Sequence, residues 1–280
     1  MNNINLILPE IFISLSIMFL LVLGVFKKNS SKLVYNIALL VLLFSIIITL
    51  NETYSIDRIT LFNDSIVIDY MSSLMKIITL VSAFFVLVIS PSYLKTFKIF
   101  KIEYPILILS SVLGMMVMIS SNDLMVFYMG LELQSLALYV LATFNRDQLK
   151  SSEAGLKYFV LSALSSGLLL YGCSLIYGFS GSTNFDIISY QLNSNEYALT
   201  FGIVFILVGL AFKISAVPFH MWAPDVYEGS PTSVTLFFTM VPKVAALTVF
   251  IRFLYVPFLN LIDQWQIIII FLSIASMLFG

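Results

Sequence analysis

The sequence LVGLAFKISAVPFHMWAPDVYEGSP, residues 207–231, predicts a membrane helix that two prolines interrupt. Its first half is apolar but contains a lysine, Lys213. Pro218 and Pro224 are expected to break the helix, because proline lacks a backbone N–H and its ring clashes with the preceding turn. The only histidine of the chain, His220, lies between the two prolines. Broken membrane helices are typical of segments that line a cavity or an ion path.

The composition of the 280 residues indicates an integral membrane protein. Hydrophobic residues make up 60% and charged residues 10%, whereas soluble domains contain about 25% charged residues. The single cysteine, Cys173, excludes an internal disulfide, and with one histidine no metal or haem site is expected. The motifs of nucleotide-binding and hydrolytic enzymes are also absent. We therefore expect a lipid bilayer and protein partners, no nucleic acid, and redox chemistry only in a partner.

Apolar runs long enough to cross a bilayer predict an all-α polytopic protein. The expected helices cover residues 4–26, 33–50, 70–90, 105–120, 124–144, 152–179, 197–217 and 232–255, and a ninth begins near residue 266. The segments 51–69, 91–104 and 180–196 are expected to be loops, and Ser152 is the expected N-cap of the sixth helix. The ninth helix is cut short, so we expect the chain to be a fragment that further helices follow.

Charged residues in the loops predict the orientation. Lysine and arginine concentrate in alternate loops, which contain Lys27, Lys28, Lys32, Lys95, Lys98, Lys101, Arg146 and Lys150. The opposite loops are mostly acidic. The positive-inside rule places the basic loops in the cytoplasm, or in the mitochondrial matrix, and the N-terminus outside.

Three charges are expected near the middle of the bilayer. Glu132 lies about 12–14 Å below the outer end of the fifth helix, and Lys243 about 16 Å from the inner end of the eighth. Lys213 follows some sixteen residues of the seventh helix. A charge in hydrocarbon costs about 2.5 to 17 kcal/mol, so such residues are usually functional. Burial favours a neutral carboxyl and a nearby lysine favours a carboxylate, so moving the lysine would load or release a proton.

Each of these residues also has a purely structural interpretation. Glu132 could be a hydrogen-bonded structural carboxyl, and Lys213 could extend its amine towards the membrane surface. His220 is as consistent with a structural hydrogen bond as with proton transfer. Lys157 lies one turn after Glu153, which favours a surface ion pair, although a partly buried lysine could modulate its neighbours. Lys76 is expected to reach the membrane surface.

Four segments together resemble a known family. They read FKISAVPFHMWAPDVYEGSPTSVT at 212–235, GLELQSLALYVLA at 130–142, EAGLKYFVLSALSSGLLLYG at 153–172 and VPKVAAL at 241–247. They look like the antiporter-like membrane subunits of the proton-pumping NADH–quinone oxidoreductase, respiratory complex I. The sequence around His220 is more similar to that of the N-type subunits than to those of the L-type and M-type subunits or the Mrp-type antiporters.

The resemblance implies an antiporter-like helix bundle. Residues 1–104 would form helices one to three, 105–256 one five-helix repeat with a broken seventh helix, and 257–280 the start of helix nine, with the second repeat missing. Glu132 and Lys213 would be a charge pair, Lys243 the relay lysine, His220 part of the inner access route, and Lys157 a modulating lysine.

The same resemblance implies a non-redox subunit of a translocase. NADH, FMN, iron–sulfur clusters and quinone would be used by the whole complex and none bound by this chain. The expected partners are neighbouring subunits of the M and K/J types, in a bacterial plasma membrane or a mitochondrial inner membrane. The alternatives are a subunit of a multi-subunit cation/proton antiporter, a structural subunit that pumps nothing, and a membrane subunit of an energy-converting hydrogenase.

Overall fold

The computed structural model describes residues 6–27, 30–52, 58–191 and 196–279. The helices are α1 (Leu8–Phe26), α2 (Ser31–Glu52), α3 (Tyr70–Thr96), α4 (Glu103–Ile119), α5 (Leu124–Ala142), α6 (Leu149–Ser180), α7 (Phe185–Gln191), α8 (Glu196–Ile214), α9 (Trp222–Gly229), α10 (Thr232–Tyr255), the 3-10 turn η3 (Leu259–Leu261) and α11 (Ile262–Phe279). Seven helices of the described chain are long and apolar enough to cross a membrane. The predicted class, an all-α polytopic membrane protein, is confirmed, apart from one short hairpin of strands.

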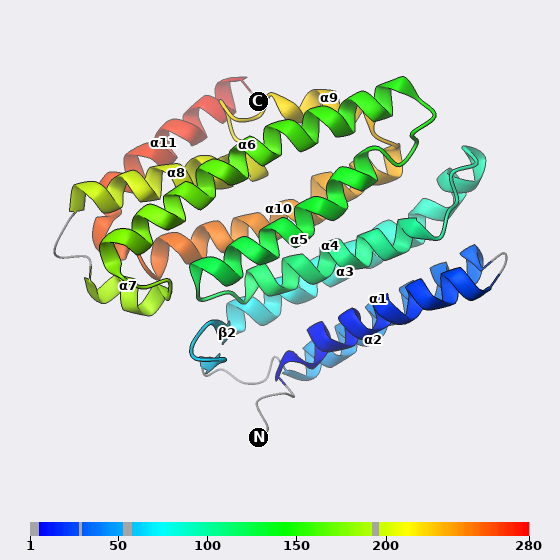
Figure 1. Ribbon diagram of the computed structural model, residues 1–280, viewed down its shortest axis with the longest axis horizontal. Helices are drawn as coiled ribbons and strands as arrows, with labels where there is room; N and C mark the ends of the chain where they lie inside the picture. The colour runs from blue at the N-terminus through cyan, green and yellow to red at the C-terminus, as the bar shows by residue number, and fades with distance from the viewer. Residues whose placement is uncertain (1–5, 28–29, 53–57, 192–195, 280) are drawn as a thin grey trace.

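The long helices run side by side, with α1 and α2 at one edge of the bundle and α11 at the other (Figure 1). Figure 1 also places the α3–α4 and α5–α6 connections and α9 at one end, and the β-strands and α7 at the opposite end. The expected grouping of basic and acidic loops at opposite ends is therefore present in the fold.

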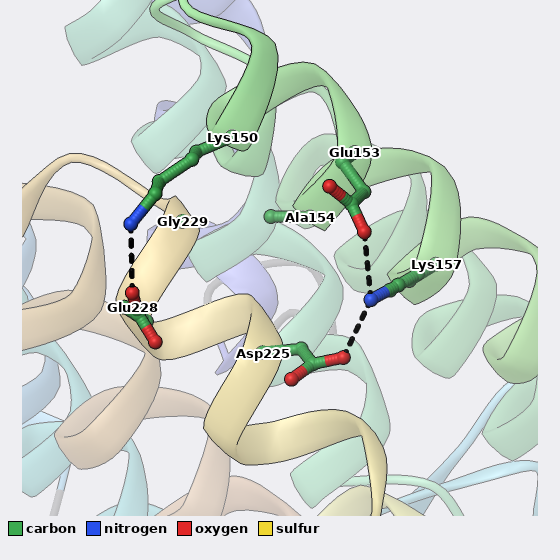
Figure 2. Close-up of a pocket in the computed structure, with 7 residues that line it drawn as sticks. All are labelled: Lys150, Glu153, Ala154, Lys157, Asp225, Glu228 and Gly229. Atoms are coloured by element: carbon green, nitrogen blue, oxygen red, sulfur yellow. Dashed lines mark hydrogen bonds and ion pairs between the residues drawn. The ribbon is translucent and has the colours of Figure 1, made fainter.

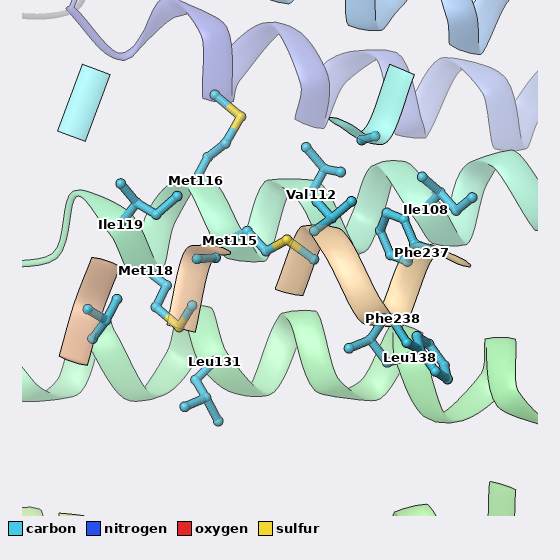
Figure 3. Packing of buried hydrophobic residues seen from close by; sticks show 14 of the residues in the cluster. Ile108, Val112, Met115, Met116, Met118, Ile119, Leu131, Leu138, Phe237 and Phe238 are labelled. Carbon is cyan, nitrogen blue, oxygen red and sulfur yellow. The ribbon is translucent and has the colours of Figure 1, made fainter. Parts of the chain in front are cut away.

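Glycine allows α4 and α5 to pack at very short range. A Cβ atom added to Gly114 would lie 2.5 Å from the backbone nitrogen of Gln134, and one added to Gly130 would lie 2.8 Å from that of Met118. Small residues are the usual means of close helix approach in membranes. Met115, Leu131 and other apolar side chains of α4, α5 and α10 form the buried core shown in Figure 3.

The third helix is longer than the sequence predicts. It continues through Pro91 to Thr96, so the expected loop at 91–104 begins six residues too early. Proline cannot donate to the carbonyl four residues before it. Here that carbonyl, on Leu87, accepts a hydrogen bond of 2.6 Å from the Tyr35 hydroxyl of α2. The break is avoided because another helix satisfies the unpaired oxygen.

The start of the sixth helix also differs from the prediction. It begins at Leu149 with Gln148 at the N-cap position, and Ser152 lies within its first turn. The Ser152 hydroxyl donates to the carbonyl of Arg146 at 3.2 Å. The prediction of Ser152 as N-cap is therefore wrong, and α6 extends to 32 residues.

Two segments expected to be loops contain regular structure. Residues 51–69 include the antiparallel strands β1 (Ile59–Leu61) and β2 (Ile66–Ile68), and residues 180–196 include α7. Asn122, in the α4–α5 turn, donates to the Asp64 carbonyl at 2.9 Å and to the Asp186 carboxylate at 2.8 Å. Arg58 pairs with Asp186 at 2.7 Å. These bonds join three loops that are far apart in the sequence.

Candidate functional site

The break in the seventh predicted helix separates α8 from α9. α8 ends at Ile214, Ser215 has a positive φ of 63°, and α9 begins at Trp222. The indole of Trp222 donates to the Phe212 carbonyl at 2.9 Å, which satisfies one of the carbonyls left free at a helix end. The predicted break around Pro218 is confirmed.

Pro224 does not break a helix. It lies in the first turn of α9, where a proline costs no intrahelical hydrogen bond. The prediction that Pro224 interrupts the helix is therefore wrong, and the interruption is confined to residues 215–221.

Lys213 turns its amine into the bundle and not towards the membrane surface. It lies in the last turn of α8 and is 7% exposed. Its Nζ donates to Ser135 Oγ of α5 and to Ser162 Oγ of α6, each at 2.7 Å. The ring centroid of Tyr139 lies 5.9 Å from the same nitrogen. Three helices therefore meet at this amine.

Glu132 lies near Lys213 but does not contact it. The carboxyl is half-buried on α5, and its Oε1 atom is buried without a hydrogen-bond partner. An electrostatic interaction connects the two side chains. Among the ion pairs of the described residues, however, none joins Glu132 to Lys213. The structure therefore places Glu132 and Lys213 in the same site, without a direct contact between their side chains.

Lys243 contacts α9 and not Lys213. It is half-buried on α10, and its Nζ lies 5.5 Å from the ring centroid of Tyr227. The Tyr227 hydroxyl and His220 Nδ1 are both buried without a hydrogen-bond partner in the described chain. Orphaned buried polar atoms of this kind usually bind ordered water. His220 within the break, Tyr227 of α9 and Lys243 of α10 thus supply polar atoms around the helix break.

Lys157 forms a surface cluster and joins neither Glu132 nor Lys213. Its Nζ lies 2.8 Å from Glu153 and 2.7 Å from Asp225, and its side chain is 42% exposed. Figure 2 shows this cluster beside a second pair, Lys150 with Glu228 at 2.9 Å. The expected pair with Glu153 is confirmed. The pair with Asp225 links α6 to α9, and sequence spacing could not reveal it.

A further buried charge pair escaped the sequence analysis. Lys76 of α3 lies 2.5 Å from Glu10 of α1, with side chains 5% and 8% exposed. The prediction that Lys76 reaches the membrane surface is therefore wrong. Lys76 was expected at the surface because it lies near one end of its helix, and its pairing with Glu10 depends on the packing of α1 within the bundle.

The side chains brought together at this site are titratable. The described residues contain no group of three His, Cys, Asp or Glu side chains that could hold a metal ion. A half-buried carboxyl, one buried and one half-buried lysine and a histidine lie in a helix bundle around an interrupted helix. This combination defines a polytopic membrane protein of the antiporter-like class.

Comparisons with known proteins agree with this class. The family described as NADH:quinone oxidoreductase/Mrp antiporter, TM, matches residues 121–280, so the chain belongs to this family. A relative from Pelagibacter ubique named NADH-quinone oxidoreductase subunit N is 76% identical over the whole chain. The chain spans 59% of the length of that relative. The resemblance to the N-type subunits is confirmed.

Solved structures share the fold. A chain of respiratory complex I from Thermus thermophilus matches with a TM-score of 0.76 and 30% identity, over 87% of this chain and 52% of that chain. A chain of the Mrp complex from Dietzia matches with a TM-score of 0.78 over 91% of this chain and 49% of that chain. The identity to the Dietzia chain is 22%, so that similarity concerns the fold alone.

Proposed function

We propose that this chain is part of a proton-translocating membrane subunit of an NADH–quinone oxidoreductase. One observation carries the proposal: the Lys213 amine is buried where α5, α6 and α8 meet, next to a helix break, and no carboxylate of the described residues is in contact with it. A purely structural lysine would be expected to pair or to reach water, because an unpaired buried charge is costly. Relatives named as subunit N of this enzyme support the same function.

The proton path would use the residues around the break. His220 and Tyr227 would admit protons from the basic end, and Lys213 would bind and release them under the influence of Glu132. Lys243 would pass them onward, and the position of its amine over the Tyr227 ring supports that role. Lys157 would act only indirectly, through α9 and Asp225. In this scheme residues 105–256 form one five-helix repeat, and 1–104 pack against it.

The redox steps would belong to other subunits. We propose that NADH, FMN, iron–sulfur clusters and quinone are used elsewhere in the complex and that this chain binds none of them. Its partners would be neighbouring membrane subunits of the M and K/J types. The bacterial sources of the relatives favour a bacterial plasma membrane, with the basic loops in the cytoplasm.

A cation/proton antiporter subunit is the second candidate, because the Mrp chain from Dietzia shares the fold. The two functions differ in what drives transport. NADH-driven proton pumping by the purified assembly, with quinone and without an imposed ion gradient, supports the first. Pumping that requires a sodium gradient supports the second.

The decisive experiment is to measure proton pumping in the assembled complex with Lys213→Ala or Glu132→Ala in its complete subunit. Native gel electrophoresis checks assembly, and Lys32→Ala, an exposed lysine, is the control. We expect both variants to assemble and to lose most of their pumping. Normal assembly with full pumping would show that the buried charges serve packing, and would overturn the proposal.

A further inference from the structure

Two grooves flank the last turn of α5, at the end of the bundle where α5 connects to α6 (Figure 1). The first lies between α4 and α5 and has a volume of about 210 Å³, and the second lies between α5 and α6 and has a volume of about 360 Å³. Val140 and Thr143 line both grooves, so a single turn of chain separates them. An apolar cavity of about 150 Å³ holds a molecule the size of benzene. Each groove therefore has room for a stretch of hydrocarbon chain.

The walls of both grooves carry large apolar side chains. Leu107 and Phe144 line the first groove, and Leu156 and Phe159 line the second. Within the described chain Val140, Leu156 and Phe159 are exposed. Contiguous exposed apolar surface of this kind marks a contact with lipid or with another protein.

Lys101 and Arg146 bring two positive charges to the first groove. Lys101 lies just before α4 and Arg146 lies after α5, so both lie at the ends of these helices. Neither takes part in an ion pair of the described residues, whereas Lys150 and Lys157 each have a carboxylate partner. Glu103 also lines this groove but pairs with neither cation. The groove therefore has a net positive charge and two cations available to a ligand.

A phosphate group is the anion that fits this pair of cations. The guanidinium of arginine matches two phosphate oxygens, and the amine of lysine binds phosphate as a point charge. Basic pockets at the ends of membrane helices bind the head groups of anionic lipids. A free phosphate ion would leave the apolar walls uncovered, whereas a phospholipid supplies both an anion and hydrocarbon. The charge at the helix ends and the apolar grooves beside them therefore favour a whole lipid.

We propose that the two grooves form a binding site for an anionic glycerophospholipid. Its phosphate lies between Lys101 and Arg146, and its two acyl chains occupy the two grooves, one on each side of α5. Tyr139 also lines the second groove, and the centroid of its ring lies 5.9 Å from the Lys213 amine. The lipid is therefore separated from that buried amine by one aromatic side chain. This site is distinct from the proposed proton path, so the two proposals can fail separately.

A photoreactive lipid tests the proposal on the assembled complex that contains the complete subunit. The complex is reconstituted in phosphatidylcholine vesicles with a small fraction of phosphatidylglycerol that carries a diazirine in one acyl chain. A second preparation contains phosphatidylcholine with the same diazirine, which measures contact without a net head-group charge. After illumination, mass spectrometry gives the labelled fraction at Val140, Leu156 and Phe159. We expect the anionic probe to label these residues severalfold more than the zwitterionic probe.

Three double variants assign the difference to the two cations. Lys101→Ala/Arg146→Ala should remove the excess labelling by the anionic probe, and Lys101→Arg/Arg146→Lys, which keeps both charges, should retain it. Lys27→Ala/Lys32→Ala is the matched control, because it removes the same charge from two exposed lysines that flank the α1–α2 connection. Its labelling should equal that of the wild type. Native gel electrophoresis checks the assembly of each variant.

Three results with the variants or the probes would overturn the proposal: equal labelling of the wild type by the two probes, an excess that persists in Lys101→Ala/Arg146→Ala, or an equal loss in the control. A wild type without label at the groove residues would show that a neighbouring membrane subunit covers the grooves, and would overturn it as well. The comparison of the two probes on the wild type requires no variant, so it decides the proposal even if a variant fails to assemble.

Discussion

Glu10 and Lys76 form the ion pair whose two partners are most deeply buried in the described chain. Removing one partner from such a pair leaves an uncompensated charge, whereas replacing both by apolar residues is often neutral. The second oxygen of Glu10 has no hydrogen-bond partner, so the pair is held by one contact.

We expect Lys76→Met to lower the stability of the complete subunit by about 3–5 kcal/mol, and Glu10→Leu/Lys76→Met to recover most of that loss. Thermal unfolding in detergent measures both. Lys32→Met, at an exposed lysine, should have little effect. A double variant as unstable as the single one would contradict this account of the pair.

A second prediction concerns pH. Asp69 caps α3 and pairs with Arg252 of α10 at 2.8 Å. Burial raises the pKa of the Asp69 carboxyl, but the Arg252 charge and the hydrogen bonds from Ser72 outweigh burial and bring the pKa below its ordinary value of 3.8. The stabilisation is therefore present above pH 3.8 and is lost as the pH falls through the lowered pKa.

The expected result is that Asp69→Asn lowers the unfolding temperature at pH 7 and that its difference from the wild type shrinks as the pH is brought to 3. Asp64→Asn, at an exposed carboxyl, is the control. A difference that stays constant over this range would show that the charge of Asp69 contributes nothing.

At the residue scale, the sequence predicts the buried charges only in part. Lys213 is identified because it lies in the middle of an apolar run, as do Glu132 and Lys243, which are half-buried. The other charged side chains that are buried in the described chain, Glu10, Lys76 and Arg252, are missed because their ion-pair partners are distant in the sequence. Ser135 could have been noticed one turn after Glu132. Ser162 could not, because it reaches Lys213 only through the packing of α6 against α8.

At the scale of elements, the sequence predicts the helices well and their ends less well. The range 232–255 agrees with α10. The end of α3 is wrong because the hydrogen bond that supports Pro91 comes from Tyr35, which is distant in the sequence. Local rules fail where a second helix supplies the missing partner.

The α4–α5 contact gives a test at this scale. Gly114→Ala should destabilise the subunit by about 1–3 kcal/mol, because its Cβ would collide with the backbone of α5, which cannot move aside as a side chain would. Gly178→Ala is the matched control, since a Cβ there meets nothing within 4 Å, and alanine favours the helix by up to about 1 kcal/mol. Equal stability of the two variants would show that α4 and α5 do not pack this closely.

At the scale of the whole molecule, the two ends of the bundle differ in charge and in construction. One end has the exposed α6–α9 ion pairs, and the other has the Asn122 network that ties β2 and α7 to the α4–α5 turn. The sequence predicts which loops share an end from their charge. It does not reveal the network, because its partners are widely separated along the chain.

The orientation of these ends in the membrane can be measured by cysteine labelling, since the native Cys173 is buried. Tyr190 and Asp147 are exposed at opposite ends. Tyr190→Cys should react with an impermeant maleimide in intact spheroplasts, and Asp147→Cys only after the membrane is opened. The reverse pattern would invert the predicted topology.

The Glu10–Lys76 pair also constrains the order of biosynthesis. Glu10 emerges from the ribosome long before Lys76, and an unpaired carboxylate is poorly tolerated among lipid chains. The contact between α1 and α3 that this ion pair makes can therefore form only after α3 has been synthesised.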